Sequence, residues 1–435
     1  MLLVTSDKDL SKLLDTPTRQ FALYERLAVL GTFRGPVNAP ANASDGDVHF
    51  RDAGFCEDLH HHARSKSLFT SCDEGFASRV AWFPGLMHYN DPVQALKAKG
   101  SIHVIDTETM SSRQLQFTNF DGPFITHGID IIDDPEDSEA IYIMAVNHRP
   151  SREYLTSQAA SGRGAAPLLD ARIEVFHHII GSNEARHVRS VSHPLLTLPN
   201  DVLATSPTSF HVTIDHYYTY GIMRLIEDLF PRARWSYILH VDCSGVAAAL
   251  PEADTECTAT VALTGIQNNN GLGHGRTPDE ILIGCAVSGR MYVGRLKELG
   301  GSIEIVDMVQ YPANIDNPSY FHDPYANSTF DASGVLNVGL YKALTLPQTS
   351  ADPEGKEGSM AWLLRPNSST GSLLGSSLSS WETGLLFEDE GDRMRFASGG
   401  ALVAIDPAKE AGQRKAWLFM AGALAPSVFA VKVDL

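Results

Sequence analysis

Residues 280–307 have the sequence EILIGCAVSGRMYVGRLKELGGSIEIVD, which contains three short runs of apolar or alternating residues. The runs are Glu280–Gly284, Arg290–Gly294 and Ser302–Asp307, and Gly, Ser and charged residues separate them. Runs of this length and composition, bounded by turn residues, are typical of β-strands. Because no long helical stretch separates the runs, the sequence argues against a βαβ unit and favours an all-β fold.

The same kind of sequence extends from about residue 48 to the C-terminus. Further strands are expected at 101–106, 140–145, 172–176, 210–214, 236–241, 361–364, 400–405, 415–419 and 428–433. They form about six groups that recur every 40 to 60 residues or so, roughly the spacing of propeller blades, although a sandwich or barrel also fits. We expect a nearly continuous apolar strand to lead each group, because an inner strand is buried on both faces.

Residues 1–45 differ from the rest of the chain. Apolar residues between Asp9 and Leu30 follow helical spacing, which Gly31 and Pro36 interrupt. We therefore predict an N-terminal helical segment over 1–45 and one β-unit over 46–435. Long insertions at 83–99, 154–168 and 349–382 interrupt the strand groups, and loops of this length are usually functional or disordered.

The charge balance limits the classes of partner. Lys and Arg number 34 against 52 Asp and Glu, so the formal net charge is −18. Binding to nucleic acid or to an anionic membrane surface needs cationic side chains, and this excess of acid argues against both. No apolar run approaches the ~18 residues of a transmembrane helix.

The cysteines and the first residues bear on the cellular location. The five cysteines are an odd, sparse set, and we do not interpret them as a disulfide framework. The carboxylate of Glu57 would raise the pKa of the neighbouring thiol of Cys56 and disfavour a thiolate there. The start of the sequence has no basic and apolar signal pattern, so we expect a cytoplasmic protein, although three Asn-x-Ser/Thr sequons leave secretion open.

Paired polar residues beside the expected strands are the most informative chemical feature. They are Glu57-Asp58, Asn200-Asp201, Asp316-Asn317 and Asn270, which ends the run Asn268-Asn269-Asn270. Carboxylate and amide oxygens are hard ligands, and a calcium ion takes six to eight of them. Each pair alone is more often a turn cap. In a propeller, however, the inner strands of all blades meet at one axis, and the separated pairs would converge there.

Histidines near strand ends are the second feature. His127, His148 and His216 lie beside apolar runs, where a histidine near a cation could act as a general base, although most such histidines are structural. The tract at 60–62 resembles a metal site, but strand alternation would send its middle member to the opposite face. We therefore expect the tract, and His177-His178 as well, to be solvated strand edges.

These motifs together resemble the paraoxonase/arylesterase family. In order they are Glu57-Asp58-Leu59, His127-Gly128-Ile129, Val146-Asn147-His148, Asn200-Asp201, Asp215-His216-Tyr217, Asn270-Gly271 and Asp316-Asn317. The resemblance runs from about residue 25 to the C-terminus, and low overall identity marks a divergent member. It implies a six-bladed β-propeller with two calcium ions in its central tunnel.

The resemblance also implies residue roles. The catalytic ion would be held by Glu57, Asn200, Asn270, Asp316 and Asn317, and the structural ion by Asp58, Asp201 and the backbone carbonyl of Ile129. His127 would take a proton from water and His148 would orient it. The implied activity is calcium-dependent hydrolysis of small-molecule lactones or aryl esters. The alternatives are a metal-dependent isomerase or cyclase that uses the same tunnel, and a non-catalytic interaction propeller. The oligomeric state stays open.

One departure from the animal members of this family concerns closure of the ring. Those members join the N-terminal region to the last strand by a disulfide, but residues 428–435 contain no cysteine. We therefore expect strand pairing alone to close the ring, with Gly46–Phe50 as the partner of the last strand.

Overall fold

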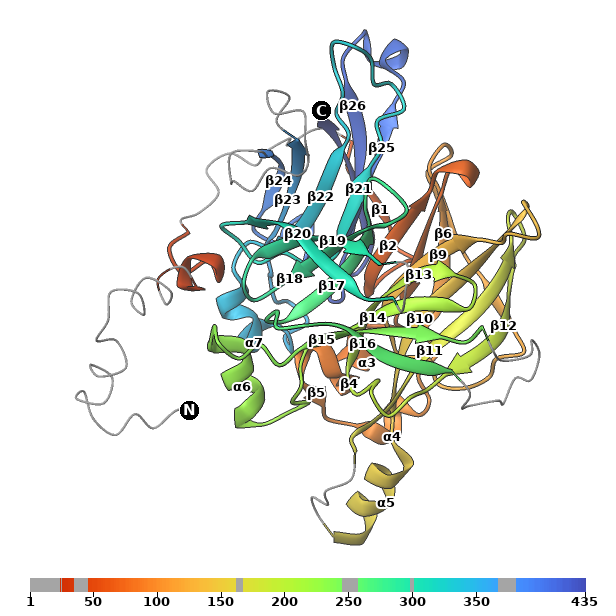
Figure 1. Ribbon diagram of the computed structural model, residues 1–435, viewed down its shortest axis with the longest axis vertical. Coiled ribbons are helices and arrows are strands. Elements are labelled where there is room, and N and C mark those ends of the chain that lie inside the picture. The colour runs from red at the N-terminus through yellow and green to blue at the C-terminus, as the bar shows by residue number, and fades with distance from the viewer. Residues whose placement is uncertain are drawn as a thin grey trace.

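The computed structural model describes residues 24, 26–34, 46–161, 167–244, 257–297, 301–366 and 381–435. Six sheets of four or five strands surround a common centre (Figure 1), and a small two-stranded sheet lies in one insertion. The protein is therefore a six-bladed β-propeller, as the strand spacing and the family resemblance predicted. Each of the twelve strands predicted from the quoted runs overlaps a strand of the structure.

The strands follow the chain order sheet by sheet. Sheet one holds β2 (Cys56–His62), β3 (Ser67–Cys72), β6 (Ser101–Asp106) and β7 (Ser111–Gln114). Sheet two holds β9 (Thr126–Asp133), β10 (Ala140–Pro150), β11 (Leu169–Ile179), β12 (Glu184–Val191) and the parallel edge strand β8 (Gln116–Thr118). Sheet three holds β13 (Pro199–Ser206), β14 (Ser209–Ile214), β15 (Tyr237–Asp242) and β16 (Thr258–Thr264). Sheet four holds β17 (Asn269–His274), β18 (Glu280–Cys285), β19 (Arg290–Leu296) and β20 (Ile303–Gln310). Sheet five holds β21 (Pro318–Phe321), β22 (Gly334–Leu340), β23 (Ser359–Pro366) and β24 (Trp381–Asp389). Sheet six holds β25 (Gly399–Ile405), β26 (Lys415–Ala421), β27 (Val428–Asp434) and β1 (Val48–Phe50).

The first strand of each sheet lies at the centre of the ring. β2, β9, β13, β17, β21 and β25 contact one another in that order, and β25 returns to β2. The expectation that an apolar strand leads each group fails for β2, β13 and β17, because these first strands carry polar pairs. The nearly continuous apolar strands, such as β10 and β18, come second and are covered by sheets on both sides.

The hydrophobic core is divided into wedges between the sheets. Six clusters of buried apolar residues each join two neighbouring sheets. One of them packs Phe387 of sheet five against Phe429 of sheet six, with ring centroids 5.6 Å apart. Burying an aromatic or aliphatic side chain of this size contributes about 1.5–3 kcal/mol, so each wedge stabilises the packing of its two sheets.

The N-terminal strand closes the ring. β1 pairs antiparallel with β27, and Val48, His49 and Phe50 lie opposite Ala430, Phe429 and Val428. This confirms the expectation that residues 46–50 close the propeller by strand pairing. Of residues 1–45, only 24 and 26–34 are described; they contain a helical turn, and the rest of the predicted Asp9–Leu30 helix lies outside the described residues.

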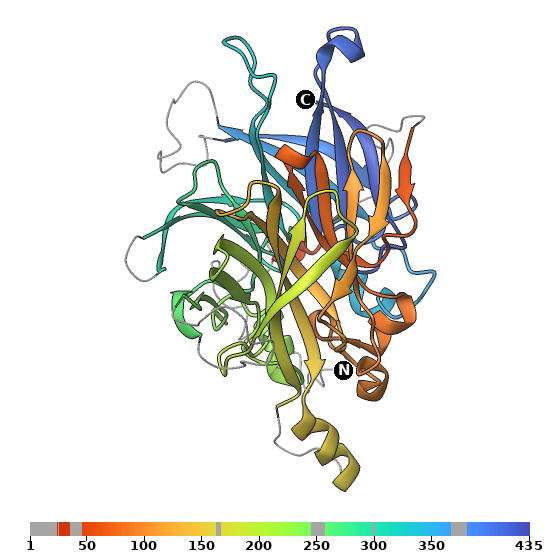
Figure 2. The same ribbon diagram turned by 90° about the vertical axis from the view of Figure 1, so that its right-hand side faces the viewer.

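Short helices gather at the lower end of the ring in Figure 1, and Figure 2 shows the same grouping. They are α3 (Phe76–Ala81), α4 (Pro92–Ala95), α6 (Ile222–Leu229) and α7 (Leu346–Thr349), with the two-stranded sheet β4 (Trp82–Phe83) and β5 (His88–Tyr89); α5 (Arg152–Ser161) projects away from the ring. The insertions predicted at 83–99 and 154–168 contribute to this end, although 162–166, and 367–380 of the third insertion, lie outside the described residues. Among the described helices, none is long and apolar enough to cross a membrane.

Two disulfides correct our interpretation of the cysteines. Cys56 pairs with Cys72, and Cys243 pairs with Cys257, while Cys285 is free and buried. Cys56 and Cys72 lie opposite each other on β2 and β3, a juxtaposition that cysteine number cannot reveal.

We expect the Cys243→Ser variant to lose about 3 kcal/mol of unfolding free energy, because closing a loop of about 15 residues restricts the unfolded chain by that amount. Urea unfolding with and without a reductant measures the effect. Reductant should shift the wild-type midpoint further than that of the variant. Equal shifts in the two proteins would contradict a stabilising bond between Cys243 and Cys257.

Candidate active site

Acidic side chains from three sheets gather near the axis of the ring. Glu57 and Asp58 lie on β2, Asp201 on β13, and Asp316 two residues before β21. Burial, together with the charge of Asp58, raises the pKa of Glu57 to about 8. Burial and neighbouring acids also raise the pKa values of Asp201 and Asp316 well above the ordinary range. The structure thus brings these four predicted residues together, and holding them ionised requires a compensating cation.

Buried oxygens without hydrogen-bond donors occur in the same place. Within the described residues, the Oδ1 atoms of Asn200, Asn270, Asp316 and Asn317 are buried and accept no hydrogen bond. Asn317 donates through Nδ2 to Glu57 Oε1 (3.2 Å), so its amide orientation is set from the carboxylate side. An unsatisfied buried acceptor costs about 1–3 kcal/mol. Four of them beside buried carboxylates form a set of hard oxygen donors that fits a cation such as calcium.

Two glycines allow this close approach between neighbouring strands. A Cβ on Gly271 would overlap Asn317, and a Cβ on Gly128 would overlap Asp201. Gly128 also places the backbone of Ile129 beside Asp201, and Ile129 itself is fully buried in β9. A side chain at either glycine would push the inner strands apart.

The residues expected to hold the structural ion differ from the catalytic set. Asp201 accepts hydrogen bonds from the backbone N–H groups of Val202 (2.8 Å) and Leu272 (2.6 Å). Asp58 Oδ2 lies 2.9 Å from His60 Nε2. Their oxygens therefore already have partners in the protein. Across the described chain, no group of three or more His, Cys, Asp and Glu side chains is arranged to hold a metal ion; the unsatisfied set mixes amides with carboxylates.

The expectation that the histidine tract at 60–62 is a solvated strand edge is wrong for its first member, His60. His60 is mostly buried and lies between Asp58 and Asp130, whose Oδ1 is 3.5 Å from His60 Nδ1. Although burial opposes its charge, Asp58, Asp130 and Asp201 raise the pKa of His60 to about 10. His178 is buried as well. Strand alternation predicted the exposure of His60 wrongly because the inner strand β2, like every inner strand of the ring, is covered on both faces.

The two predicted catalytic histidines contact each other. His127 on β9 and His148 on β10 place Nδ1 and Nε2, respectively, 2.8 Å apart. Burial, with the charge of the neighbouring ring, lowers the pKa of His127 well below its ordinary value, and burial lowers that of His148 to about 3. Both rings are therefore neutral at pH 7, and one of the two facing nitrogens donates a hydrogen bond to the other.

The backbone of this histidine pair is firmly held. Asn147 accepts a hydrogen bond from the N–H of Ile125 (2.9 Å) and donates to Glu174 Oε1 (2.9 Å). The N–H of His148 donates to the carbonyl of Ile125 (3.0 Å), and the indole of Trp82 donates to the carbonyl of His148 (2.8 Å). The insertion that contains β4 thus fixes the end of β10 where His148 lies.

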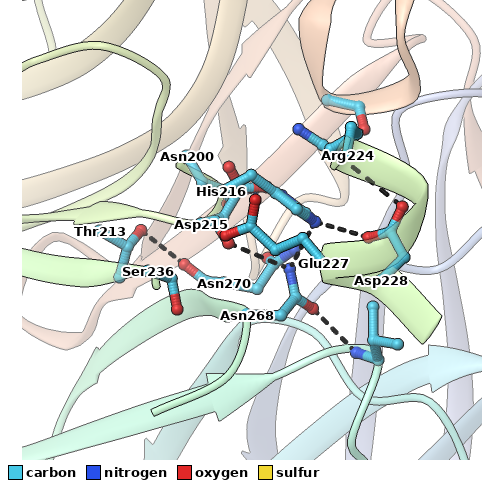
Figure 3. A network of polar contacts seen from close by, with 12 residues as sticks. Asn200, Thr213, Asp215, His216, Arg224, Glu227, Asp228, Ser236, Asn268 and Asn270 are labelled. Carbon is cyan, nitrogen blue, oxygen red and sulfur yellow. Dashed lines mark hydrogen bonds and ion pairs between the residues drawn. The ribbon is translucent and has the colours of Figure 1, made fainter. Parts of the chain in front are cut away.

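Asp215 and His216 also belong to the site, although the sequence analysis gave Asp215 no role. Asn200 Nδ2 donates to Asp215 Oδ2 (3.3 Å), which lies 2.9 Å from His216 Nδ1 (Figure 3). His216 Nε2 in turn lies 2.6 Å from Asp228 Oδ1 on α6. Asn268 donates to the Asp215 carbonyl (3.5 Å). The sequence indicates this position through His216 and the Asp215-His216-Tyr217 motif, and the acid of the pair is the same kind of signal as the other polar pairs.

Two buried arginines complete the polar network, and nothing in the sequence distinguishes them from other arginines. Arg79 on α3 donates to the carbonyls of Thr126 (2.6 Å) and Phe55 (2.7 Å), so it joins the insertion to the two inner strands next to Glu57. Arg224 on α6 donates to the carbonyl of Gly85 (3.3 Å). Both helices are therefore anchored to the neighbouring segments by buried cations.

Part of the chain is similar in sequence to known proteins. A family model described as arylesterase matches residues 165–253. Serum paraoxonase/arylesterase 2 of Gallus gallus is 27% identical over 169 residues, which cover 38% of this chain and 40% of that protein. Human serum paraoxonase/lactonase 3 is 26% identical over 168 residues, covering 38% and 40%. The aligned part thus spans about two fifths of the curated relatives' length.

Solved structures with a similar course of the chain have low sequence identity to it. A luciferin-regenerating enzyme aligns over 92% of this chain and 96% of its own, with a TM-score of 0.42 and 10% identity. The Malassezia sympodialis allergen Mala s 1 aligns over 90% and 97%, with a TM-score of 0.46 and 11% identity.

The fold and the central residues define a class: six-bladed β-propellers with acids, amides and a histidine pair near the axis of the ring. Within that class, part of the chain is similar to the arylesterase family model and to the serum paraoxonases, over about two fifths of its length.

Proposed function

We propose that the protein is a calcium-dependent hydrolase of small-molecule lactones and aryl esters. The observation that carries the proposal is the set of four buried, unsatisfied oxygens of Asn200, Asn270, Asp316 and Asn317 beside Glu57. Two carboxylates in this set balance one dication, and its oxygen chemistry is that of calcium sites. The names of the relatives, which are arylesterases, paraoxonases and a lactonase, support ester hydrolysis.

The five residues of this set would hold the catalytic ion, which would polarise the substrate carbonyl as a Lewis acid when bound. His127 would accept a proton from the attacking water, and His148, 2.8 Å away, would orient the ring that does so. The helices anchored by Arg79 and Arg224 would exclude bulk water from this end of the tunnel.

A second, structural ion at Asp58, Asp201 and the carbonyl of Ile129 belongs to the same proposal. Its support is the raised pKa of Asp201, which burial and Asp58 cause. Because the oxygens of Asp58 and Asp201 already have protein partners, we expect this ion to bind more weakly than the catalytic one. Metal analysis of the purified protein should find two calcium ions per chain. During stepwise calcium removal, the structural ion should leave before the catalytic one.

A substrate panel with a chelator tests the activity. The protein should hydrolyse simple lactones and aryl acetates, and EDTA should stop it, with recovery after calcium is added back. Reaction in ¹⁸O-labelled water should place the label in the carboxylate product. Turnover of a substrate without label uptake would instead indicate isomerisation or cyclisation, and no turnover across the panel would contradict the proposal.

We expect the His127→Gln variant to keep measurable activity. A positioned general base contributes about 10²–10⁴-fold to the rate. The substitution removes this base but leaves the polarisation of the carbonyl intact. We therefore expect kcat to fall by a factor in that range while calcium affinity stays unchanged. Steady-state kinetics on an aryl acetate and calcium titration check both values. Full activity of the variant on its best substrate would show that His127 is not the base.

A further inference from the structure

A small cavity outside the tunnel residues is lined by cationic side chains. It measures about 220 Å³, and Arg26, Arg232, Arg234 and Arg290 line it. The four residues come from three parts of the chain: the N-terminal helical turn, the segment after α6, and the start of β19. None of the described residues that line it is acidic.

This concentration of positive charge is unusual for this chain. The protein has 52 acidic residues against 34 Lys and Arg, so carboxylates are the commonest charged groups that could have balanced the arginines. Like charges in one small cavity repel each other, and the repulsion grows as the local dielectric constant falls. A cavity whose described lining holds four arginines and no carboxylate is therefore suited to an anion from solution.

Two of the four arginines are held by hydrogen bonds within the protein, and the other two are exposed to solvent. Arg26 donates to the carbonyl of Val287 and to Gln267 Oε1, and Arg290 Nε donates to Gln310 Oε1 (2.9 Å). Arg232 and Arg234 are exposed, and within the described residues their guanidinium groups make no hydrogen bond or ion pair. The cavity thus has an ordered cationic base and two side chains at its mouth that are free to close on a ligand.

We propose that this cavity binds a phosphate group, either as inorganic phosphate or as the phosphate of a small ester. Guanidinium groups form paired hydrogen bonds with phosphate oxygens, and a dianion with several acceptors suits four of them better than a single carboxylate does. The hydroxyl groups of Ser288 and Tyr292 in the lining add donors. The volume is below the roughly 300 Å³ of typical pockets for larger ligands, so the ligand is small.

Bound phosphate would connect the N-terminal turn to the helices over the tunnel. Gln267, which accepts from Arg26, donates through Nε2 to the carbonyls of Glu227 (2.8 Å) and Phe230 (3.0 Å) at the end of α6. An anion held by Arg26 and the two arginines after α6 would strengthen the same link. The proposal does not depend on the proposed hydrolase activity.

Calorimetric titration of the full-length protein with inorganic phosphate tests the site, at constant ionic strength and at a calcium concentration that keeps calcium phosphate dissolved. We expect saturable binding and a rise in the thermal unfolding temperature. The double variant Arg232→Gln/Arg234→Gln should bind at least about tenfold more weakly, because it loses two guanidinium groups that would form charge-assisted hydrogen bonds with the anion.

A matched control removes two exposed arginines elsewhere. Arg276→Gln/Arg295→Gln makes the same change in net charge and should bind phosphate like the wild type. Phenyl phosphate should compete with inorganic phosphate for the cavity. Such competition would show that small phosphate esters also bind there. Absence of saturable binding, equal weakening in both double variants, or binding only to anionic phosphatidylglycerol vesicles would overturn the proposal, because each would leave only general charge attraction.

Discussion

Replacing Asp316 with alanine should abolish hydrolysis. Asp316 supplies one of the two carboxylates in the proposed catalytic set, and its Oδ1 is buried without a hydrogen-bond donor in the described structure. Polarisation of the carbonyl by a metal ion is worth several kcal/mol, and every 1.4 kcal/mol or so is tenfold in rate. We therefore expect kcat/KM to fall by about a thousandfold or more, together with loss of tight calcium binding.

The paired measurement separates metal loss from unfolding. Calorimetric titration measures calcium binding and circular dichroism checks folding. Both are carried out on Asp316→Ala and on Asn270→Ala, which removes an amide ligand of the same set. Asp331→Ala removes an exposed carboxylate from the loop that follows β21 and should retain activity and calcium binding. Retention of calcium affinity and of activity within about tenfold of the wild type in a folded Asp316→Ala protein would exclude Asp316 from the metal site.

Calcium removal should make stability strongly dependent on pH. Burial and neighbouring charge raise the pKa of Glu57 to about 8 and those of Asp201 and Asp316 well above their ordinary values when no cation compensates them. A carboxyl group whose pKa is raised on folding contributes stability that is present below its unfolded pKa and is lost as the pH rises through the folded pKa. The chelated protein should therefore lose several kcal/mol between about pH 4 and pH 8.

Bound calcium should remove this dependence, because the ion compensates the ionised carboxylates. Urea unfolding between about pH 5 and pH 8, with excess calcium or with EDTA, gives the two curves, which should separate as the pH rises. The Glu57→Gln variant has one acid fewer, so its chelated form should lose less stability over the same range. A chelated wild-type protein whose stability stays constant or rises over this range would show that these carboxylates do not repel one another as the structure indicates.

Much of the fold could be predicted from local sequence. Short apolar runs between turn residues placed the strands, and residues 46–50 were correctly paired with the last strand. The prediction failed where the burial of a strand depends on its neighbours. His60 was assigned to solvent by alternation within one strand, yet the adjacent inner strand supplies Asp130 on its other side.

The candidate site shows the same division. The Glu57-Asp58 and Asp316-Asn317 pairs and the two histidines are visible as types of residue at strand ends, and the family resemblance assigned roles to them. Arg79 could not be found in this way, because its partners, the carbonyls of Phe55 and Thr126, are set by how the insertion folds over two blades.

The order of residues alone therefore determined the strands, the number of blades and the chemical nature of the donors, since these depend on short-range spacing and side-chain type. Closure of the ring decided which donors meet, because residues some 260 positions apart, such as Glu57 and Asn317, come within hydrogen-bonding distance only when all six sheets are packed around one axis.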